Sequence, residues 1–131
     1  MILYNTDMKI PISNTLYGRK NHLTNVKKID VKILNKMSFQ NVNAKRFPSI
    51  KLIPKCLNFG LLTPTIVNAS NEVLVNLFLK GKIGFLDIVK TINKIFKDKE
   101  FNKYAKRKPR SIKDIRMADN WARLKTINMC V

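Results

Sequence analysis

Apolar residues follow no regular spacing in the first third of the chain, but from Ala44 onward they recur every three or four residues. This recurrence is the period of an amphipathic helix. A first helix is predicted after Pro48, and Gly60 ends it, because glycine commonly follows the last turn of a helix. Pro54 would kink a helix that begins at Pro48. It costs nothing if the helix begins near Ile53, because the ring then lies in the first turn.

The segment from about Thr65 to Lys80 predicts the second helix, and Gly81 closes it. Apolar residues point to almost all of its sides: Val73, Leu74, Val75, Leu77, Phe78 and Leu79. A helix that is apolar on all sides is typical of a buried, central position. We therefore predict that this helix forms the centre of the domain and that Leu77 belongs to its core.

Two further amphipathic helices are predicted. Asp87 caps the third helix, and the apolar face of that helix consists of Ile88, Ile92, Ile95 and Phe96. A basic, turn-prone stretch follows and ends at Arg110. Ser111 and Asp114 then form a capping box for the fourth helix. The apolar stripe of the fourth helix consists of Met117, Ala118, Trp121, Ala122 and Leu124.

Residues 1–17 are compatible with two structures. Ile2–Tyr4 resemble the end of a strand, and apolar and polar residues alternate along Met8–Ile12, which favours an extended arm. A short helix with Pro11 at its first position is equally compatible with this segment. Residues 18–43 are polar and rich in lysine, which predicts a linker with one or two short strands or turns.

The predicted fold is therefore mainly α, with a bundle of about four helices over residues 44–131. The arm at 1–17 and the linker at 18–43 precede this bundle. No apolar run approaches the ~18–20 residues that a membrane-spanning helix needs. The N-terminus also lacks the charged region and the long apolar segment of a signal peptide. No membrane partner is expected, and a membrane-surface helix at Lys90–Lys108 is a weaker alternative.

The formal net charge of +18 has two interpretations. The first is a surface that binds nucleic acid or an anionic membrane. The second is the amino-acid usage of an AT-rich genome, since lysine, asparagine and isoleucine are all abundant. The lysines are scattered from Lys9 to Lys125, and only Lys103–Arg110 is a dense basic run. This spread favours the second interpretation. A free-standing basic helical module that binds nucleic acid non-specifically remains the alternative.

Few residues in the chain suggest chemistry. His22 is the only histidine, and Cys56 and Cys130 lie far apart, so no pair has the spacing of metal ligands. There is no glycine-rich phosphate-binding motif, and none of the eight acidic residues forms a pair spaced to hold a metal. The polar stretch Asn68–Glu72 could form a site, but a structural role at the start of a helix is favoured.

Six blocks of sequence resemble the C-terminal part of the 1-deoxy-D-xylulose 5-phosphate reductoisomerase family, in the family's order and with similar spacing. The most specific block is VNASNE at Val67–Glu72. The others are DMKIPI at Asp7–Ile12, RFP at Arg46–Pro48 with Lys51–Leu52, LFL at Leu77–Leu79, KIGFLDI at Lys82–Ile88, and NWAR at Asn120–Arg123. The sequence departs from the family pattern at Thr6, at Leu16–Arg19 and at Ser49, which leaves the local shape of the pocket wall and linker open.

The resemblance implies an NADPH-dependent enzyme that uses Mg or Mn and makes 2-C-methyl-D-erythritol 4-phosphate for isoprenoid biosynthesis. In that family the nicotinamide domain and the metal and phosphate ligands precede the block that Asp7–Ile12 resembles. The chain is therefore interpreted as a C-terminal fragment without catalytic, cofactor or metal residues, inactive alone. By the same resemblance, Met8 lines the substrate pocket.

The resemblance also implies partners and a location. The intact enzyme is a homodimer, and the fragment would act with the missing NADPH and catalytic domains. A bacterial cytoplasm is expected, with a plastid or apicoplast as the alternative. Any binding of nucleic acid is expected to be non-specific.

Overall fold

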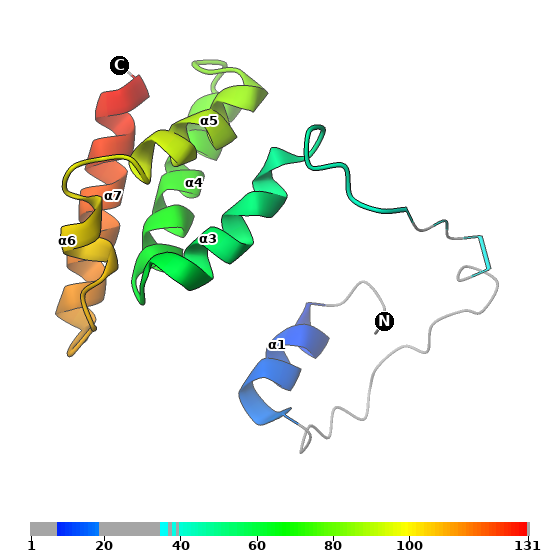
Figure 1. The fold of residues 1–131 in the computed structure, drawn as a ribbon, viewed down its shortest axis with the longest axis horizontal. Helices are drawn as coiled ribbons and strands as arrows, with labels where there is room; N and C mark the ends of the chain where they lie inside the picture. Colours follow the sequence, from blue (N-terminus) through cyan, green and yellow to red (C-terminus); the bar gives the residue numbers. More distant parts are fainter. Residues whose placement is uncertain (1–7, 19–34, 37, 39, 131) are drawn as a thin grey trace. The chain divides into compact units, whose positions relative to one another are not determined.

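The computed structural model describes residues 8–18, 35–36, 38 and 40–130 (Figure 1). All regular secondary structure in these residues is helical. The chain divides into two compact units, residues 1–41 and 42–131. The mainly α fold predicted from the sequence is confirmed.

The first unit contains α1 (Lys9–Tyr17), so the extended arm expected for Met8–Ile12 is wrong. A short helix forms, as the alternative allowed, but it begins at Lys9 and not at Pro11. Pro11 is the third residue of α1, where its missing N–H needs no partner inside the helix. The Thr15 hydroxyl donates a 2.8 Å hydrogen bond to the Pro11 carbonyl. Gly18 ends the helix with a φ of +56°. The strand expected at residues 2–4 and most of the expected linker lie outside the described residues.

The second unit begins with a short 3₁₀ helix, η2 (Pro48–Lys51), which leads into α3 (Leu52–Phe59). Pro54 is the third residue of α3, so its ring lies in the first turn, as one of the two sequence interpretations predicted. Gly60 ends the helix as predicted. None of the residues of α3 is fully buried, so this helix lies at the edge of the domain.

The centre of the domain is the pair α4 (Thr63–Leu79) and α7 (Ile112–Cys130), which make the most extensive contacts between helices. The buried positions of α7 recur every four residues: Asp114, Ala118, Ala122 and Thr126. Those of α4 are Thr63, Ile66, Ala69, Ser70 and Leu74. Because many of these side chains are small, the two backbones can pack closely. The prediction that the second helix is central is correct.

Two details of the predicted core are wrong. Leu77 is half-buried, and Leu74 is the fully buried leucine of α4. On α7, Met117 and Leu124 are exposed, although both were assigned to the apolar stripe. The rest of the predicted stripe is correct: Ala118 and Ala122 are buried, and Trp121 packs against the same core cluster.

α5 (Phe85–Ile95) buries Ile88, Ile92 and Ile95, as predicted. It begins two residues before Asp87, which is the third helical residue and not the cap itself. The Asp87 carboxylate accepts a 3.0 Å hydrogen bond from the Gly84 N–H. The negative charge therefore still stabilises the first turn of the helix, as an acid there should.

A short helix, α6 (Phe101–Ala105), lies in the stretch that the sequence predicted to be turns. Its Phe101 is fully buried, and the Phe101 ring packs against those of Phe59 and Phe96 at centroid distances of 5.9 and 5.0 Å. This aromatic cluster joins α3, α5 and α6. The domain therefore contains four longer helices, as expected, and two short ones, η2 and α6, among the described residues.

Gly60→Ala is expected to destabilise the helical domain by about 3 kcal/mol. Gly60 has a φ of +140°, and an added Cβ would lie 2.7 Å from the Ala105 carbonyl oxygen. Backbone atoms cannot move aside as a flexible side chain can. The matched control is Gly81→Ala, because Gly81 also has a positive φ but open space around it, and should cost about 1 kcal/mol. If chemical denaturation gave the same loss of unfolding free energy for both variants, the contact with Ala105 would not matter.

Candidate functional site

Met8, the one residue assigned to the substrate pocket, lies at the N-cap of α1. Its carbonyl oxygen accepts a 3.3 Å hydrogen bond from the Ile12 N–H, which anchors the residue to the first turn. Its side chain is 70% exposed. The structure thus presents a flexible, apolar thioether at the start of a short helix, which is a side chain suited to lining a pocket.

A groove of about 310 Å³ lies between α3, α4 and α5. Its lining is mostly apolar: Leu52, Cys56, Pro64, Val67, Asn68, Asn71 and Ile92. The four α4 residues are spaced by three, one and three positions, which places them on one face of the helix. Burial raises the pKa of the Cys56 thiol, so this group stays protonated at neutral pH and is a poor nucleophile. The groove therefore suits an apolar side chain better than a reacting substrate.

The polar stretch Asn68–Glu72 lies within α4, and its side chains contact α7. Arg123 of α7 donates a 2.6 Å hydrogen bond to the Glu72 carboxylate and a 2.8 Å bond to Asp119. The Asn68 amide donates to the other Glu72 oxygen at 3.1 Å. The hydrogen bond from Arg123 lowers the pKa of the Glu72 carboxyl, and the two carboxylates raise the pKa of Arg123. The stretch therefore has a structural role, but it lies in the middle of α4, where it contacts a neighbouring helix, and not at the helix start that the sequence indicated.

Acidic side chains elsewhere in the domain also have structural partners. Lys125 of α7 lies 2.8 Å from the Asp98 carboxylate, which follows α5. Burial opposes ionisation of Asp98, but the hydrogen bonds from Lys125 and from the Glu100 N–H outweigh it and lower the pKa of this carboxyl. Within the part of the chain that the structure describes, no three His, Cys, Asp or Glu side chains gather to hold a metal ion.

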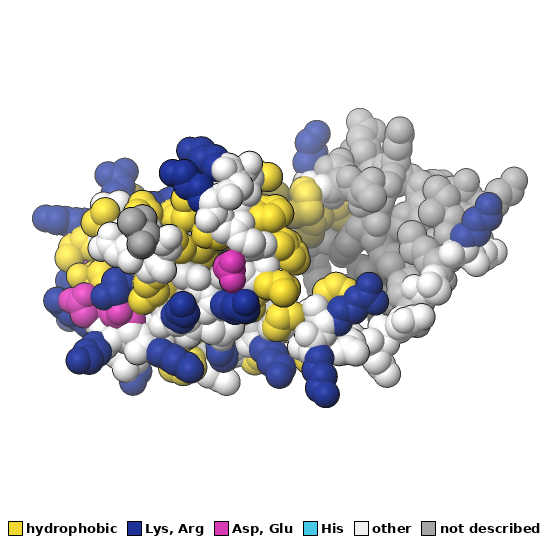
Figure 2. Space-filling model, turned by 90° about the horizontal axis from the view of Figure 1, so that it is seen from above, with side chains coloured by type: hydrophobic (Ala, Val, Ile, Leu, Met, Phe, Trp, Pro, Cys, Tyr) yellow, Lys and Arg dark blue, Asp and Glu magenta, His cyan; other side chains and the backbone are white. Residues whose placement is uncertain are grey.

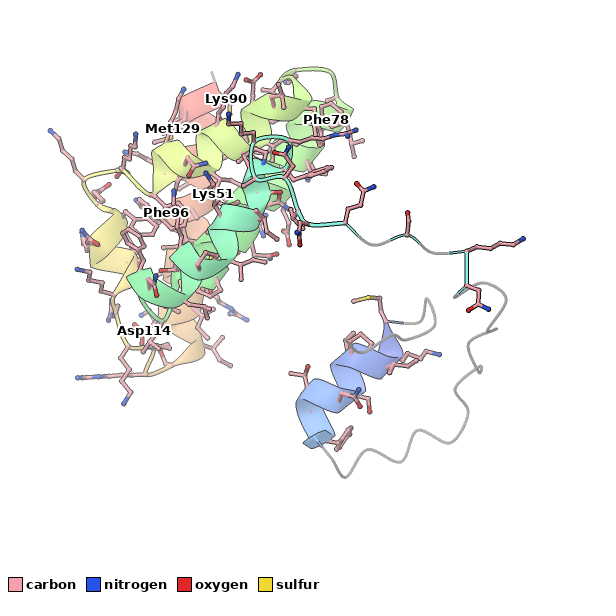
Figure 3. The ribbon with its side chains drawn as sticks, turned by 45° about the vertical axis from the view of Figure 1, so that its right-hand side comes forward. Lys51, Phe78, Lys90, Phe96, Asp114 and Met129 are labelled. Atoms are coloured by element: carbon pink, nitrogen blue, oxygen red, sulfur yellow. The ribbon has the colours of Figure 1, made fainter. Side chains whose placement is uncertain are left out.

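Asp114 stabilises the start of α7 through three groups. Its carboxylate accepts hydrogen bonds from the N–H groups of Arg110 and Ser111 at 2.9 and 3.2 Å. The Arg107 guanidinium lies 2.8 Å from its other oxygen. The Arg110 N–H, together with the Arg107 charge, holds the pKa of the buried Asp114 carboxyl below its usual value. Figure 3 shows Asp114 at the opposite end of the domain from Phe78.

Asp114→Asn should lower the melting temperature at pH 7, and the difference from the parent chain should shrink below about pH 4. A carboxyl with a depressed pKa contributes stability above its unfolded-state pKa and loses it as the pH falls through the folded-state pKa. Thermal melts followed by circular dichroism between pH 7 and pH 2 measure this difference. A difference that stays constant over the whole range would mean that Asp114 acts by shape and not by charge.

The model of one protein family, described as the DXP reductoisomerase C-terminal domain, matches residues 3–125. The chain belongs to this family. The match includes Met8 and every helix of the second unit except the last residues of α7. The family resemblance inferred from the sequence blocks is therefore confirmed.

Relatives of this family are similar to the chain over most of its length. The 1-deoxy-D-xylulose 5-phosphate reductoisomerase of Pelagibacter ubique is 37% identical over 131 residues, which is all of this chain and 34% of that protein. The apicoplastic reductoisomerase of Plasmodium falciparum is 32% identical over 127 residues, 97% of this chain and 26% of the relative. The chain thus spans about a third or less of the length of these relatives.

Solved reductoisomerase structures have the same fold. The enzyme from Zymomonas mobilis in complex with NADPH has a TM-score of 0.72 and 32% identity, and the match covers 98% of this chain and 33% of that one. A reductoisomerase in complex with magnesium has a TM-score of 0.78 at 22% identity, with the same coverage, and supports the fold alone. The six blocks in the sequence were enough to find the family, but they gave no sign of the groove, whose walls come from three helices.

Proposed function

We propose that this chain supplies the C-terminal helical domain of a 1-deoxy-D-xylulose 5-phosphate reductoisomerase. The complete enzyme converts its substrate with NADPH and Mg or Mn into 2-C-methyl-D-erythritol 4-phosphate. The observation that carries the proposal is the family match over residues 3–125, which joins the Met8 segment and the helical domain in one continuous alignment. The match of all of this chain to 34% of the Pelagibacter ubique enzyme supports the same function.

We propose that the sites for NADPH and the metal ion lie in the other domains of the complete enzyme. Most acidic side chains among the described residues cap helices or bind arginine and lysine, and Glu100 accepts a hydrogen bond from the Trp121 N–H. No group of three potential metal ligands is present among these residues. When bound in the complete enzyme, NADPH supplies the hydride and the metal holds the substrate oxygens. The role proposed for this chain is to close the substrate pocket with Met8 and to support the catalytic domain with the helical domain.

A chimera tests this function. The chain replaces the matching C-terminal third of the Pelagibacter ubique reductoisomerase, and substrate-dependent oxidation of NADPH is followed by absorbance. We expect turnover by the chimera and none by the same relative truncated before the replaced part.

Met8→Ala in the chimera is expected to lower kcat/KM by about tenfold, mainly through KM, because loss of about 1.4 kcal/mol of apolar contact weakens substrate binding by that factor. Met8→Leu is the matched control, because it conserves volume and apolar character and should stay within about threefold of the parent. An unchanged KM for the Met8→Ala variant would show that Met8 does not line the substrate pocket.

Partners and location follow from the same proposal. The chain would act with the NADPH-binding and catalytic domains, in an enzyme that forms a homodimer. We propose a bacterial cytoplasm, or a plastid of the kind named for the Plasmodium falciparum relative. No helix among the described residues has both the length and the apolar character to cross a bilayer.

The comparisons do not support the alternative of a nucleic-acid-binding module. Part of the densest basic run is also used within the domain, since Arg107 binds Asp114 and Lys103 lies over the Tyr104 ring. The Tyr104 ring itself stacks on Trp121 at 4.8 Å and is not a free platform for a base. Any binding of nucleic acid is therefore proposed to be non-specific.

A further inference from the structure

The turn between α4 and α5 carries an apolar surface that nothing in the domain covers. It consists of Phe78, Leu79, Phe85 and Leu86, here called the turn patch. Leu79, Phe85 and Leu86 are 74%, 69% and 63% exposed, and Phe78 is 37% exposed. The Phe78 and Phe85 rings meet edge to face at 5.7 Å, so the two helices present one joined apolar surface. Figure 3 shows Phe78 at the end of the domain where α4 leads into α5.

The backbone holds this turn in one conformation. The N–H of Gly81 donates to the Phe78 carbonyl at 2.9 Å, and the N–H of Lys82 donates to the Leu77 carbonyl at 2.9 Å. Gly81 has a φ of +68°, which completes this helix ending. The turn patch is therefore presented on a fixed scaffold, as a docking surface should be.

Lysines surround the turn patch. Lys80 and Lys82 lie exposed in the turn itself, and Lys90 lies exposed on α5. Asp87 is the one acid of the turn and the first turn of α5, and it binds both Gly84 and Lys90. Figure 2 shows one face of the molecule, on which hydrophobic side chains lie among many Lys and Arg side chains and few acidic ones. A partner that complements this surface needs an apolar hollow with carboxylates at its rim.

We propose that the turn patch docks on the catalytic part of the reductoisomerase, in an apolar hollow with an acidic rim. This inference rests on the proposed function. A second copy of the chain is a poor occupant, because each copy carries a formal net charge of +18 and lysines would face lysines. The relatives are about three times as long as this chain, and their remaining two thirds provide the surface for such a hollow.

The test measures how fast a cysteine at the patch reacts with a maleimide. Leu86→Cys and the control Leu124→Cys are each made with Cys56 and Cys130 changed to serine. Leu124 is 64% exposed on α7, so both cysteines are equally accessible in the isolated chain. Each variant is compared in the isolated chain and in the chimera with the Pelagibacter ubique enzyme, and mass spectrometry reads the labelling at the introduced cysteine.

We expect the cysteine at position 86 to react at least tenfold more slowly in the chimera than in the isolated chain, with no change at position 124. Equal rates at position 86 would overturn the proposal, and so would equal protection at both positions. Protection in the isolated chain at high concentration would show that a second copy covers the patch, and protection by vesicles with anionic lipid would show a membrane. Both of these results also overturn the proposal.

Activity of the chimera separates this inference from the proposed function. An active chimera with an unprotected position 86 contradicts the docking surface alone. A chimera that folds, binds NADPH and protects position 86, but shows no substrate-dependent oxidation, contradicts the proposed function alone. A double variant, Leu79→Asp with Leu86→Asp, adds a second readout: we expect unchanged helicity of the isolated chain and at least tenfold lower activity of the chimera.

Discussion

Leu74→Asp is expected to unfold the helical domain. Leu74 is fully buried on α4, where it packs with Ile88 and Ile92 of α5. The substitution removes an apolar side chain from this cluster and buries a carboxylate without a partner, at a cost of at least about 4 kcal/mol. Because small domains are stable by only about 5–15 kcal/mol, a loss of this size removes most of the folded population or all of it.

Leu79→Asp is the matched control, since Leu79 lies on the same helix and is 74% exposed. It should change the free energy of unfolding by no more than about 0.5 kcal/mol. The half-buried Leu77 should give an intermediate loss when it is changed to Asp. Circular dichroism at 222 nm, with urea as denaturant, compares the three variants. A cooperative transition for Leu74→Asp at the parent midpoint would contradict the packing of α4 against α5.

The isolated chain is expected not to oxidise NADPH with 1-deoxy-D-xylulose 5-phosphate. Holding a hydride donor and an acceptor at near-contact distance accounts for about 7–11 kcal/mol of such a barrier, a factor on the order of 10⁵ or more in rate. The described residues include an exposed Met8 but no group of metal ligands. A pocket wall alone cannot provide this positioning.

The assay contains the purified chain, NADPH, substrate and Mn, and it follows the absorbance of NADPH. The same mixture without substrate is the control. Oxidation that depends on substrate, and that survives a second purification step, would mean that the chain holds catalytic groups not recognised in its sequence.

Long periodic segments of the sequence predicted the helices well. Ile88, Ile92 and Ile95 follow the helical period, and all three are buried on α5. Asp114 belongs to the capping box predicted for the last helix, and its carboxylate accepts hydrogen bonds from the Arg110 and Ser111 N–H groups. Each of these features depends on residues within one or two turns of a helix. Such local features can be predicted from a single sequence.

Features that depend on the tertiary structure could not be predicted. The sequence did not predict α6, because its five residues lie in a basic stretch and its Phe101 is buried against the rings of nearby Phe96 and of distant Phe59. Leu124 fits the predicted apolar stripe of the last helix but is exposed, whereas Ala118 and Ala122 of α7 are buried. The groove and the turn patch also join residues of different helices, so neither has a linear motif.

Substrate-dependent NADPH oxidation by the chimera tests most directly whether this chain works as the helical domain of a reductoisomerase. The Pelagibacter ubique enzyme, in which this chain replaces the matching third, should turn over 1-deoxy-D-xylulose 5-phosphate within about tenfold of the parent enzyme's kcat/KM, a loss of about 1.4 kcal/mol. A chimera that folds, binds NADPH and still shows no substrate-dependent oxidation would contradict that function.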